Sequence, residues 1–539
     1  MSVVGCRLSV VNCQLQKNIS LLSSLFPVPC SLFPLPSSPM LSTLILLPLI
    51  AAAFFGFYPS TISGKLARII ALVFSVVIFL WSIFIAIQFN PGDVTQQFAE
   101  SLLWVDAIGL NYNLGIDGLS LPLLLLNGLL TCIAIYSSDE SQQRPRFYYS
   151  LIFLLTTGVI GAFLAQDLLL FFLFYELELI PLYLLIAIWG GARRGYAATK
   201  FLIYTAFSGI VILASFLGIV WLSGSSSFAL STLNSQNLPL ATQILLLVGI
   251  LVGFGIKIPL FPFHTWLPDA HVEASTPISV LLAGILLKLG TYGLLRFGMN
   301  LLPDAWAYLA PYLATWAVIS VLFGASCAIA QTDMKKMVAY SSIGHMGYVL
   351  LAAAASTPLS VLGAVLQMIS HGLISAMLFL LVGVVYKKTG SRDLNVVRGL
   401  LNPERGLPLI GSLMIMGVMA SAGIPGMVGF IAEFIVFRSS FAVFPLQTLL
   451  GMLGNGLTAV YFLNLVNRAF FGRLSEELYN LPRVYWSDRL PAIILAVFIV
   501  IFGIQPTWLA HYTETTITTM VNTNNLVHNS EHKIAIQNS

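Results

Sequence analysis

The chain has 539 residues, of which 58% are hydrophobic and only 9% are charged, and its formal net charge is +4. In soluble domains about a quarter of the residues are charged. This composition therefore excludes a soluble globular protein and indicates a polytopic protein whose main partner is the lipid bilayer. The small net charge gives no sign of a nucleic-acid partner. The 5 cysteines form no CxxC pair, and no P-loop or GxGxxG motif occurs, so no metal or nucleotide site is expected.

Residues 1–39 differ in composition from the rest of the chain. They are rich in Ser, Pro and Cys and contain no compact apolar region followed by a small-residue cleavage site, as a signal peptide would. An apolar segment begins at Met40 with MLSTLILLPLI. We therefore expect Met40 to be the true start and residues 1–39 to be an extension that is not part of the mature chain.

The remaining chain contains continuous apolar segments rather than alternating ones, which predicts membrane-spanning helices and not a barrel. Most lysines and arginines fall in the loops on one side of the predicted spans, which we call the basic side. The positive-inside rule makes this side cytoplasmic and places both termini on the opposite side. About fourteen segments are predicted: 41–57, 67–89, 118–138, 147–166, 168–190, 199–223, 243–263, 276–299, 312–331, 336–356, 358–387, 408–438, 445–471 and 490–511.

Two predicted spans carry helix-breaking residues. The seventh contains Pro259 and Pro262, and the twelfth contains GIPGMVG at 423–429. Two broken spans in corresponding positions suggest two inverted five-helix repeats, although ordinary proline kinks are the alternative. The predicted organisation of the chain from residue 40 is: 40–146, the first three helices; 147–299, the first repeat; 312–471, the second repeat; 472–539, the last helix and a C-terminal tail.

Five ionisable residues fall inside predicted spans, where a charge costs several kcal/mol and usually serves a function. They are Glu176, Glu178, Lys257, Lys288 and Glu433. A buried lysine can release its proton when a nearby carboxylate moves away, whereas arginine stays charged. The pattern therefore predicts a proton relay with Glu176 as the partner of Lys257. The two glutamates lie about 200° apart on a helix and cannot share a face. The alternative is that these groups are structural ion pairs.

Three histidines extend the predicted relay. His264 follows the break after Lys257, and His345 and His371 lie in successive spans between Lys288 and Glu433 in the sequence. Histidine exchanges protons near neutral pH, so these residues are candidates for hydrated relay groups. The alternative is that each is a packing residue with satisfied hydrogen bonds.

Four stretches resemble the antiporter-like subunits of the complex I family, and among these chain 4 of the NAD(P)H-quinone oxidoreductases. The resemblance covers residues 41–510 and is most specific in the HTWLPDAH block. The stretches are FLFYELELIPLYLLIAIWGG, KIPLFPFHTWLPDAHVEASTPISVLLAGILLKLGTYGLLRF, DMKKMVAYSSIGHMGYVLL and GIPGMVGFIAEF.

The resemblance implies an all-α, fourteen-helix, proton-translocating subunit in a membrane arm, with other membrane-arm subunits as partners. It assigns Glu176 and Lys257 to the first half-channel, Lys288 to the centre and Glu433 to the end of the second half. It implies no cofactor in this chain, because NAD(P)H or ferredoxin and plastoquinone are used elsewhere in the complex. The ELELIP form is similar to the cyanobacterial and chloroplast branch, which implies a thylakoid membrane and leaves respiratory and carbon dioxide uptake complexes open.

Two other functions compete with this one. The first is a subunit of a multisubunit cation/proton antiporter, which shares the fold and motifs of the complex I subunits. The second is a scaffold that moves no protons, but a scaffold does not need Lys257, Lys288 and Glu433 at membrane depth. The YELELIP and DMKKMVAYSSIGHMG blocks favour the oxidoreductase subunit.

Overall fold

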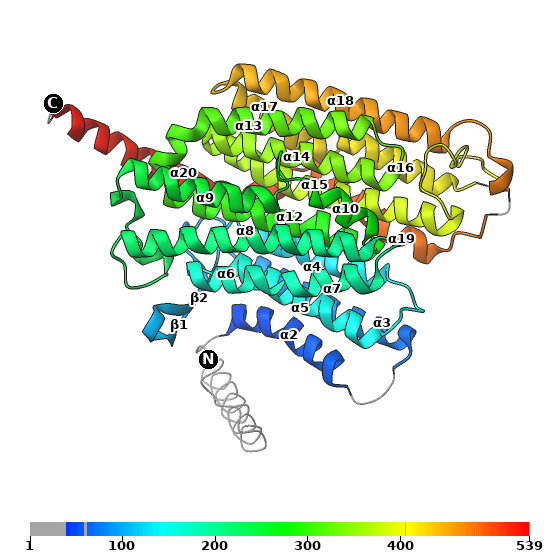
Figure 1. Ribbon diagram of the computed structural model, residues 1–539, viewed down its shortest axis with the longest axis horizontal. Helices are drawn as coiled ribbons and strands as arrows, with labels where there is room; N and C mark the ends of the chain where they lie inside the picture. Colours follow the sequence, from blue (N-terminus) through cyan, green and yellow to red (C-terminus); the bar gives the residue numbers. More distant parts are fainter. Residues whose placement is uncertain (1–38, 59–61, 405, 480, 538–539) are drawn as a thin grey trace, which may run out of the picture.

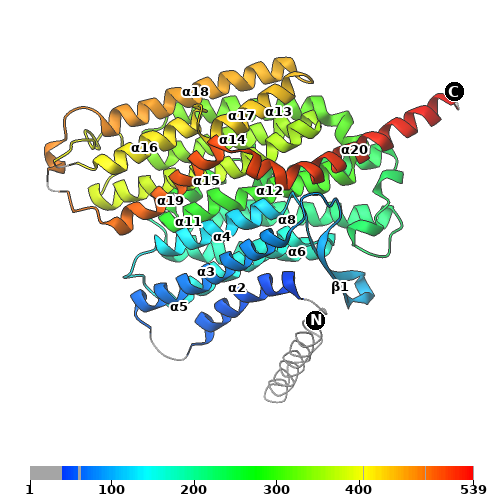
Figure 2. The same ribbon diagram turned by 180° about the vertical axis from the view of Figure 1, so that it is seen from behind.

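The computed structural model describes residues 39–58, 62–404, 406–479 and 481–537. The predicted N-terminal extension, apart from Pro39, lies outside the described residues. The helices run roughly side by side along the long axis of the molecule, as a membrane bundle requires (Figures 1 and 2).

The prediction of about fourteen spans is confirmed. Within the described residues, 12 helices are long and apolar enough to cross a membrane. Two shorter apolar helices, Leu121–Tyr136 and Pro408–Ser421, occupy the third predicted span and the first half of the twelfth. The helices that open the chain and those that close it are α2 (Met40–Phe57), α3 (Gly64–Gln88), α4 (Leu121–Tyr136), α19 (Trp486–Ile504) and α20 (Thr507–Gln537).

A β-hairpin connects α3 to α4, and the sequence analysis missed it. Strand β1 (Gln97–Val105) pairs in antiparallel register with β2 (Leu110–Ile116), with the short helix η1 (Asp106–Ile108) at the turn. The hairpin lies at the end of the bundle opposite the basic loops (Figure 1), and we call this end the hairpin side. It was overlooked because only membrane spans were sought, yet LNYNLGI alternates buried and half-buried positions over its first residues, as a strand does.

The first five-helix unit begins at residue 145. Its seventh-span helix ends at Lys257 and resumes at Trp266, so the predicted break there is confirmed. The elements are α5 (Pro145–Leu164), α6 (Leu168–Leu177), α7 (Leu179–Trp189), α8 (Arg194–Leu222), η2 (Leu230–Thr232), η3 (Ser235–Asn237), α9 (Leu240–Lys257), α10 (Trp266–Glu273), α11 (Thr276–Leu281), η4 (Leu282–Leu286), α12 (Leu287–Gly293) and η5 (Leu294–Met299).

The second unit also has its break in the fourth of its five spans. The break separates Ser421 from Val428, as the GIPGMVG stretch predicts. The inverted relation of the two units remains a prediction. The elements are α13 (Pro303–Ile329), α14 (Met334–Ala355), α15 (Pro358–Thr389), α16 (Pro408–Ser421), α17 (Val428–Phe441), α18 (Pro445–Phe470) and η6 (Glu476–Leu478).

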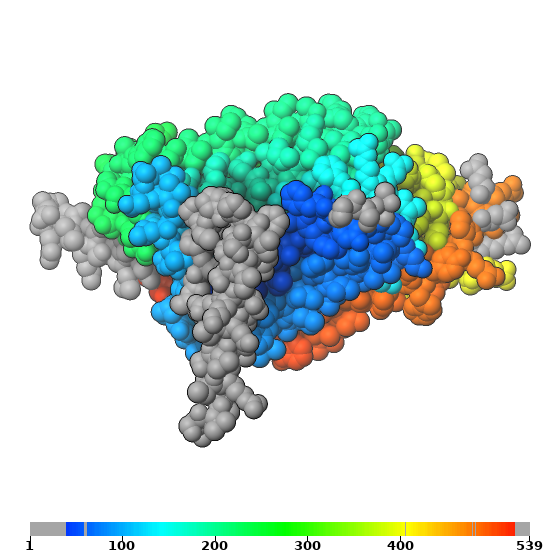
Figure 3. All heavy atoms as spheres, turned by 90° about the horizontal axis from the view of Figure 1, so that it is seen from below, coloured from blue at the N-terminus to red at the C-terminus, as the bar shows by residue number. Residues whose placement is uncertain are grey.

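The centre of the bundle is formed by helices that carry the predicted relay. The most apolar window of Thr276–Met299 is 100% buried, and those of α14 and α15 are 89% buried, against 39% for the peripheral α18. Helices α2 and α3 (blue) form much of the face in Figure 3, with the C-terminal part of the chain (orange to red) beside them. Lys288 therefore lies in the most enclosed span, shielded on both sides by other helices.

Candidate functional site

Lys257 is the last residue of α9, where the broken span turns away. Its side chain is buried, its Nζ forms an ion pair with the Glu178 carboxylate, and it lies 4.9 Å from the centre of the Tyr175 ring. The Trp266 indole donates a hydrogen bond of 2.8 Å to the carbonyl of Ile256 beside the break. The freed backbone is thus satisfied by a protein side chain, which allows an interrupted helix at membrane depth.

The predicted pairing of Lys257 with Glu176 is wrong: the carboxylate in contact is that of Glu178. Glu176 is half-buried and faces α8, where its carboxylate fills the space left by Gly209. Because the two glutamates point to different sides of the span, only one can touch Lys257.

The fifth span is itself interrupted at Glu178, between α6 and α7. Pro181 lies three residues further along and, having no backbone N–H, cannot bond the carbonyl of Leu177. The prediction of broken seventh and twelfth helices was therefore incomplete. The proline in ELELIP was the sequence signal that could have located this break.

Lys288 lies in the eighth span just after a π-helical segment, η4, and a second one, η5, follows at Leu294. Its Nζ donates a hydrogen bond of 2.5 Å to the carbonyl of Ala283 and lies 2.8 Å from Nδ1 of His371. Among the described residues, no carboxylate lies within ion-pair distance of it. Such π segments are frequent at functional sites because they free carbonyl groups within a helix.

The chain of contacts continues from His371 to Glu433. The rings of His371 and His345 lie 5.7 Å apart between centres, and Nδ1 of His345 lies 3.4 Å from Oε1 of Glu433. The other ring nitrogen of His345 lies 2.9 Å from the hydroxyl of Ser421, at the second helix break. The structure therefore brings together Lys288, His371, His345 and Glu433, as the sequence analysis predicted for this half of the relay.

A polar cavity of about 10 Å³ lies among these residues, which is about the room that one water molecule needs. His371, Gln367 and Glu433 line it. Each has a buried polar atom with no hydrogen-bond partner in the structure: Nε2, Oε1 and Oε2, respectively. A water molecule with these three partners would connect His371 directly to Glu433, in a cavity that His345 also lines.

His264 lies away from this line. Its ring packs against Phe261 and Phe323, at 5.8 Å and 4.7 Å between ring centres. No recorded contact of the described residues links it to Lys257 or Lys288. The structure therefore does not bring His264 into the relay, and its position is that of a packing residue at the basic end of the bundle.

The sequence matches known proteins over most of its length. Residues 165–458 match the protein-family model described as NADH:quinone oxidoreductase/Mrp antiporter, TM. NAD(P)H-quinone oxidoreductase chain 4 3 of Trichormus variabilis is 44% identical over 453 residues, which cover 82% of this chain and 83% of that protein. Chain 4 2 of Thermosynechococcus vestitus is 42% identical over 480 residues, covering 87% and 89%. This chain belongs to the NAD(P)H-quinone oxidoreductase chain 4 family.

Solved structures agree with this family membership. A chain of respiratory complex I from Thermus thermophilus superposes with a TM-score of 0.81 at 27% identity, covering 89% of this chain and 99% of that one. A chain of the Mrp complex from Dietzia sp. DQ12-45-1b has a TM-score of 0.79 at 18% identity, which shows a shared fold alone. It covers 90% of this chain and 98% of that one.

The structure also contains contacts of the predicted relay residues that the sequence did not reveal. Glu178 replaces Glu176 as the partner of Lys257, and Tyr175, Gln367 and Ser421 make contacts that were not predicted. Gln367 precedes His371 by one helical turn, so it lies on the same face. That spacing was a usable signal, whereas the contact of Ser421 with His345 depends on tertiary packing.

Proposed function

We propose that this chain is the proton-translocating membrane subunit of an NAD(P)H-quinone oxidoreductase. Relatives of this name at 42–44% identity support this function over that of a multisubunit antiporter subunit, since the Mrp likeness concerns the fold alone. The observation that carries the residue assignments is the line of neighbouring side chains from Lys288 through His371 and His345 to Glu433, in which the two histidine rings lie 5.7 Å apart between centres.

In the first half of the proposed path, the ion pair holds a proton on Lys257. Burial disfavours a charged lysine, and the Glu178 carboxylate offsets this cost while the two touch. Movement of Glu178 away from Lys257 would leave a buried charge without a counter-ion. Lys257 would then give up its proton toward Lys288, whose helix packs directly against it at Gly290.

In the second half, the Lys288 ammonium and Nδ1 of His371 form the first step of transfer. His371 passes the proton to a water in the cavity that His345 also lines, and the proton ends on Glu433, whose Oε1 lies 3.4 Å from Nδ1 of His345. Glu176, in the position that the family resemblance implies for the first half-channel, acts on Lys257 through its charge. Redox chemistry takes place in other subunits and drives these steps from a distance.

The cellular setting belongs to the same proposal. The cyanobacterial relatives support a thylakoid complex that uses NAD(P)H or ferredoxin and plastoquinone, with neighbouring membrane-arm subunits as partners of this chain. The basic side would then face the cytoplasm, and the hairpin side and both termini would lie on the opposite face.

Glu433→Gln tests the residue assignments directly. The variant keeps the shape of the side chain but removes the carboxylate that ends the path, so the number of protons moved per electron should fall while quinone reduction continues. Proton uptake by proteoliposomes of the purified complex measures this. The matched control is Glu404→Gln, because Glu404 is exposed in a basic-side loop. Equal pumping by both variants would contradict the assignment of Glu433.

A further inference from the structure

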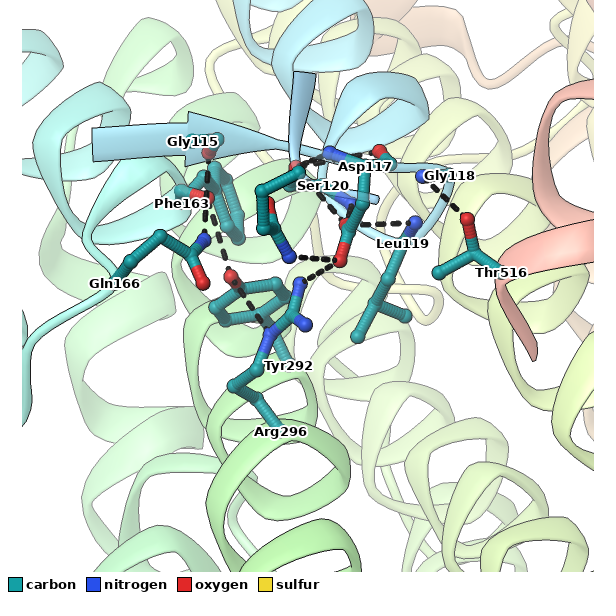
Figure 4. Close-up of polar contacts among 11 residues, drawn as sticks. Gly115, Asp117, Gly118, Leu119, Ser120, Phe163, Gln166, Tyr292, Arg296 and Thr516 are labelled. Carbon is teal, nitrogen blue, oxygen red and sulfur yellow. Dashed lines mark hydrogen bonds and ion pairs between the residues drawn. The ribbon is translucent and has the colours of Figure 1, made fainter. Parts of the chain in front are cut away.

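A second buried charged cluster lies at the hairpin end of the span that carries Lys288 (Figure 4). Arg296 donates a hydrogen bond of 2.5 Å from Nη2 to Oδ2 of Asp117, and both side chains are buried. Tyr292 lies between Lys288 and Arg296 on the same helix, one turn from each. None of these three residues belongs to the proposed proton path, although Arg296 is only two turns from Lys288.

Hydrogen bonds leave Asp117 no free site for a proton. Its Oδ1 accepts bonds of 3.1 Å from the backbone N–H groups of Leu119 and Ser120, and its Oδ2 accepts a bond of 2.9 Å from Gln96 besides that from Arg296. Burial raises the pKa of Asp117, but the Arg296 charge and these hydrogen bonds outweigh burial and hold the pKa below its usual value. Asp117 is therefore ionised at neutral pH and keeps Arg296 in place.

The hydrogen bonds of Tyr292 and Arg296 also have a fixed direction. The Tyr292 hydroxyl donates a bond of 3.1 Å to the carbonyl of Phe163 and accepts one of 3.3 Å from Nε of Arg296. A guanidinium has five N–H donors and no acceptor, and it does not release a proton in proteins. A proton moving from Lys288 toward the hairpin would meet the Tyr292 hydroxyl, which is already engaged with Phe163 and Arg296, and then a guanidinium that cannot accept it.

The cluster lies close to the outer surface of the molecule. Gln96 is half-buried and its neighbour Thr95 is exposed, so a short distance separates Asp117 from solvent. On the other side, α20 covers the turn: the Gly118 N–H donates a bond of 3.0 Å to the Thr516 hydroxyl. A Cβ at Gly118 would collide with the α20 backbone at Tyr512. The Asp117–Arg296 pair thus lies between the eighth span and the half-buried Gln96 on the hairpin side.

We propose that Arg296, held by Asp117, is a charge barrier that closes the hairpin end of the eighth span, so that a proton on Lys288 moves to His371 and not out along its own helix. This inference rests on the proposed relay through Lys288. It gives the pair a positioning role, because Arg296 touches no transferred proton itself. A buried ion pair adds little stability over an apolar pair of the same size, so stability alone does not account for it.

The test uses a double variant, Asp117→Asn with Arg296→Gln, in the assembled complex. Removing both charges avoids leaving one buried without a partner, and the amide oxygen of Asn can still accept the hydrogen bonds from the N–H groups of Leu119 and Ser120. Proteoliposomes receive an imposed pH gradient without any electron donor. We expect the gradient to decay several-fold faster than in the wild type, and the extra decay to disappear when Lys288→Met is added.

Arg438→Gln is the matched control, because Arg438 is exposed at the end of α17. Proteoliposomes with this variant should lose the imposed pH gradient at the wild-type rate. If the pH gradient decays at the wild-type rate in the assembled double variant, the proposed charge barrier is contradicted. If the double variant does not assemble, Arg296→Lys is tested instead, since lysine keeps the charge but can release a proton. Faster decay of the pH gradient in this variant supports the charge barrier, and decay at the wild-type rate contradicts it. Normal pumping by Lys288→Met alone would instead contradict the proposed relay.

Discussion

The Nζ atom of Lys288 lies 2.8 Å from Nδ1 of His371, although the two residues are 83 positions apart in the chain. This contact joins the central lysine of the first five-helix unit to the second unit, where His345 and Glu433 follow. The only charged or titratable partner of the Lys288 ammonium among the described residues is thus a group that can itself take up a proton. In the proposed relay, this contact joins two sets of buried charges into one path.

The first prediction concerns the pairing of Lys257. Glu178→Gln removes its counter-ion, and breaking a buried pair in this way costs about 3–5 kcal/mol. We expect a lower melting temperature of the complex and loss of pumping. Adding Lys257→Met should recover the melting temperature without recovering pumping. If Glu176→Gln lowers the melting temperature and Glu178→Gln does not, the pairing seen in the structure is contradicted.

The second prediction tests the position of Glu176. A methyl group at Gly209 would lie only 2.6 Å from the carboxyl carbon of Glu176, so Gly209→Ala should push this carboxylate away and reduce the protons moved per electron. Gly195→Ala is the matched control, because it lies on the same helix and its Cβ would meet nothing within 4 Å. The gain in helix propensity is larger at Gly209, in the interior of α8, than at Gly195 in its first turn, so propensity alone would not make Gly209→Ala the more harmful change. Equal pumping by both variants would show that the position of Glu176 does not matter.

The third prediction concerns the stability of the hairpin side at different pH. Asp167 caps α6 by accepting bonds from Leu169 and Leu170, and burial raises its pKa to about 6. When burial raises the folded-state pKa of a carboxyl, the fold loses stability as the pH rises. The loss falls between the unfolded pKa of about 4 and the folded pKa of about 6. Above this window the ionised side chain costs the fold about 1–3 kcal/mol.

Asp167→Asn keeps the cap and removes the charge, so it should raise the melting temperature of the complex at pH 8. The gain should shrink as the pH falls from 6 toward 4, where the wild-type carboxyl becomes neutral. Thermal unfolding of the purified complex at several pH values measures this difference. A gain that grows as the pH falls would contradict the buried state of Asp167.

The sequence was sufficient to predict which charges are buried in the bundle but not how they pair. Ionisable residues in apolar segments are visible at once, and Lys257, Lys288 and Glu433 are all buried in the structure. Their contacts depend on how each helix is rotated, and a shift of two residues in the fifth span exchanges Glu176 for Glu178. The π segments around Lys288 were unpredictable, since LLAGILLKLGTYGLL contains no proline. The hairpin was missed because its strands lie outside the apolar spans.

The most direct test of the central claim is pumping by Lys288→Met and Lys288→Arg in the assembled complex. Quinone reduction and proton uptake are measured together in the same proteoliposomes. The relay predicts that both variants continue to reduce quinone but move fewer protons per electron, because methionine holds no proton and arginine does not release one. A wild-type ratio in Lys288→Met would contradict a proton path through Lys288 and His371, and a wild-type ratio in Lys288→Arg alone would reduce Lys288 to a fixed positive charge.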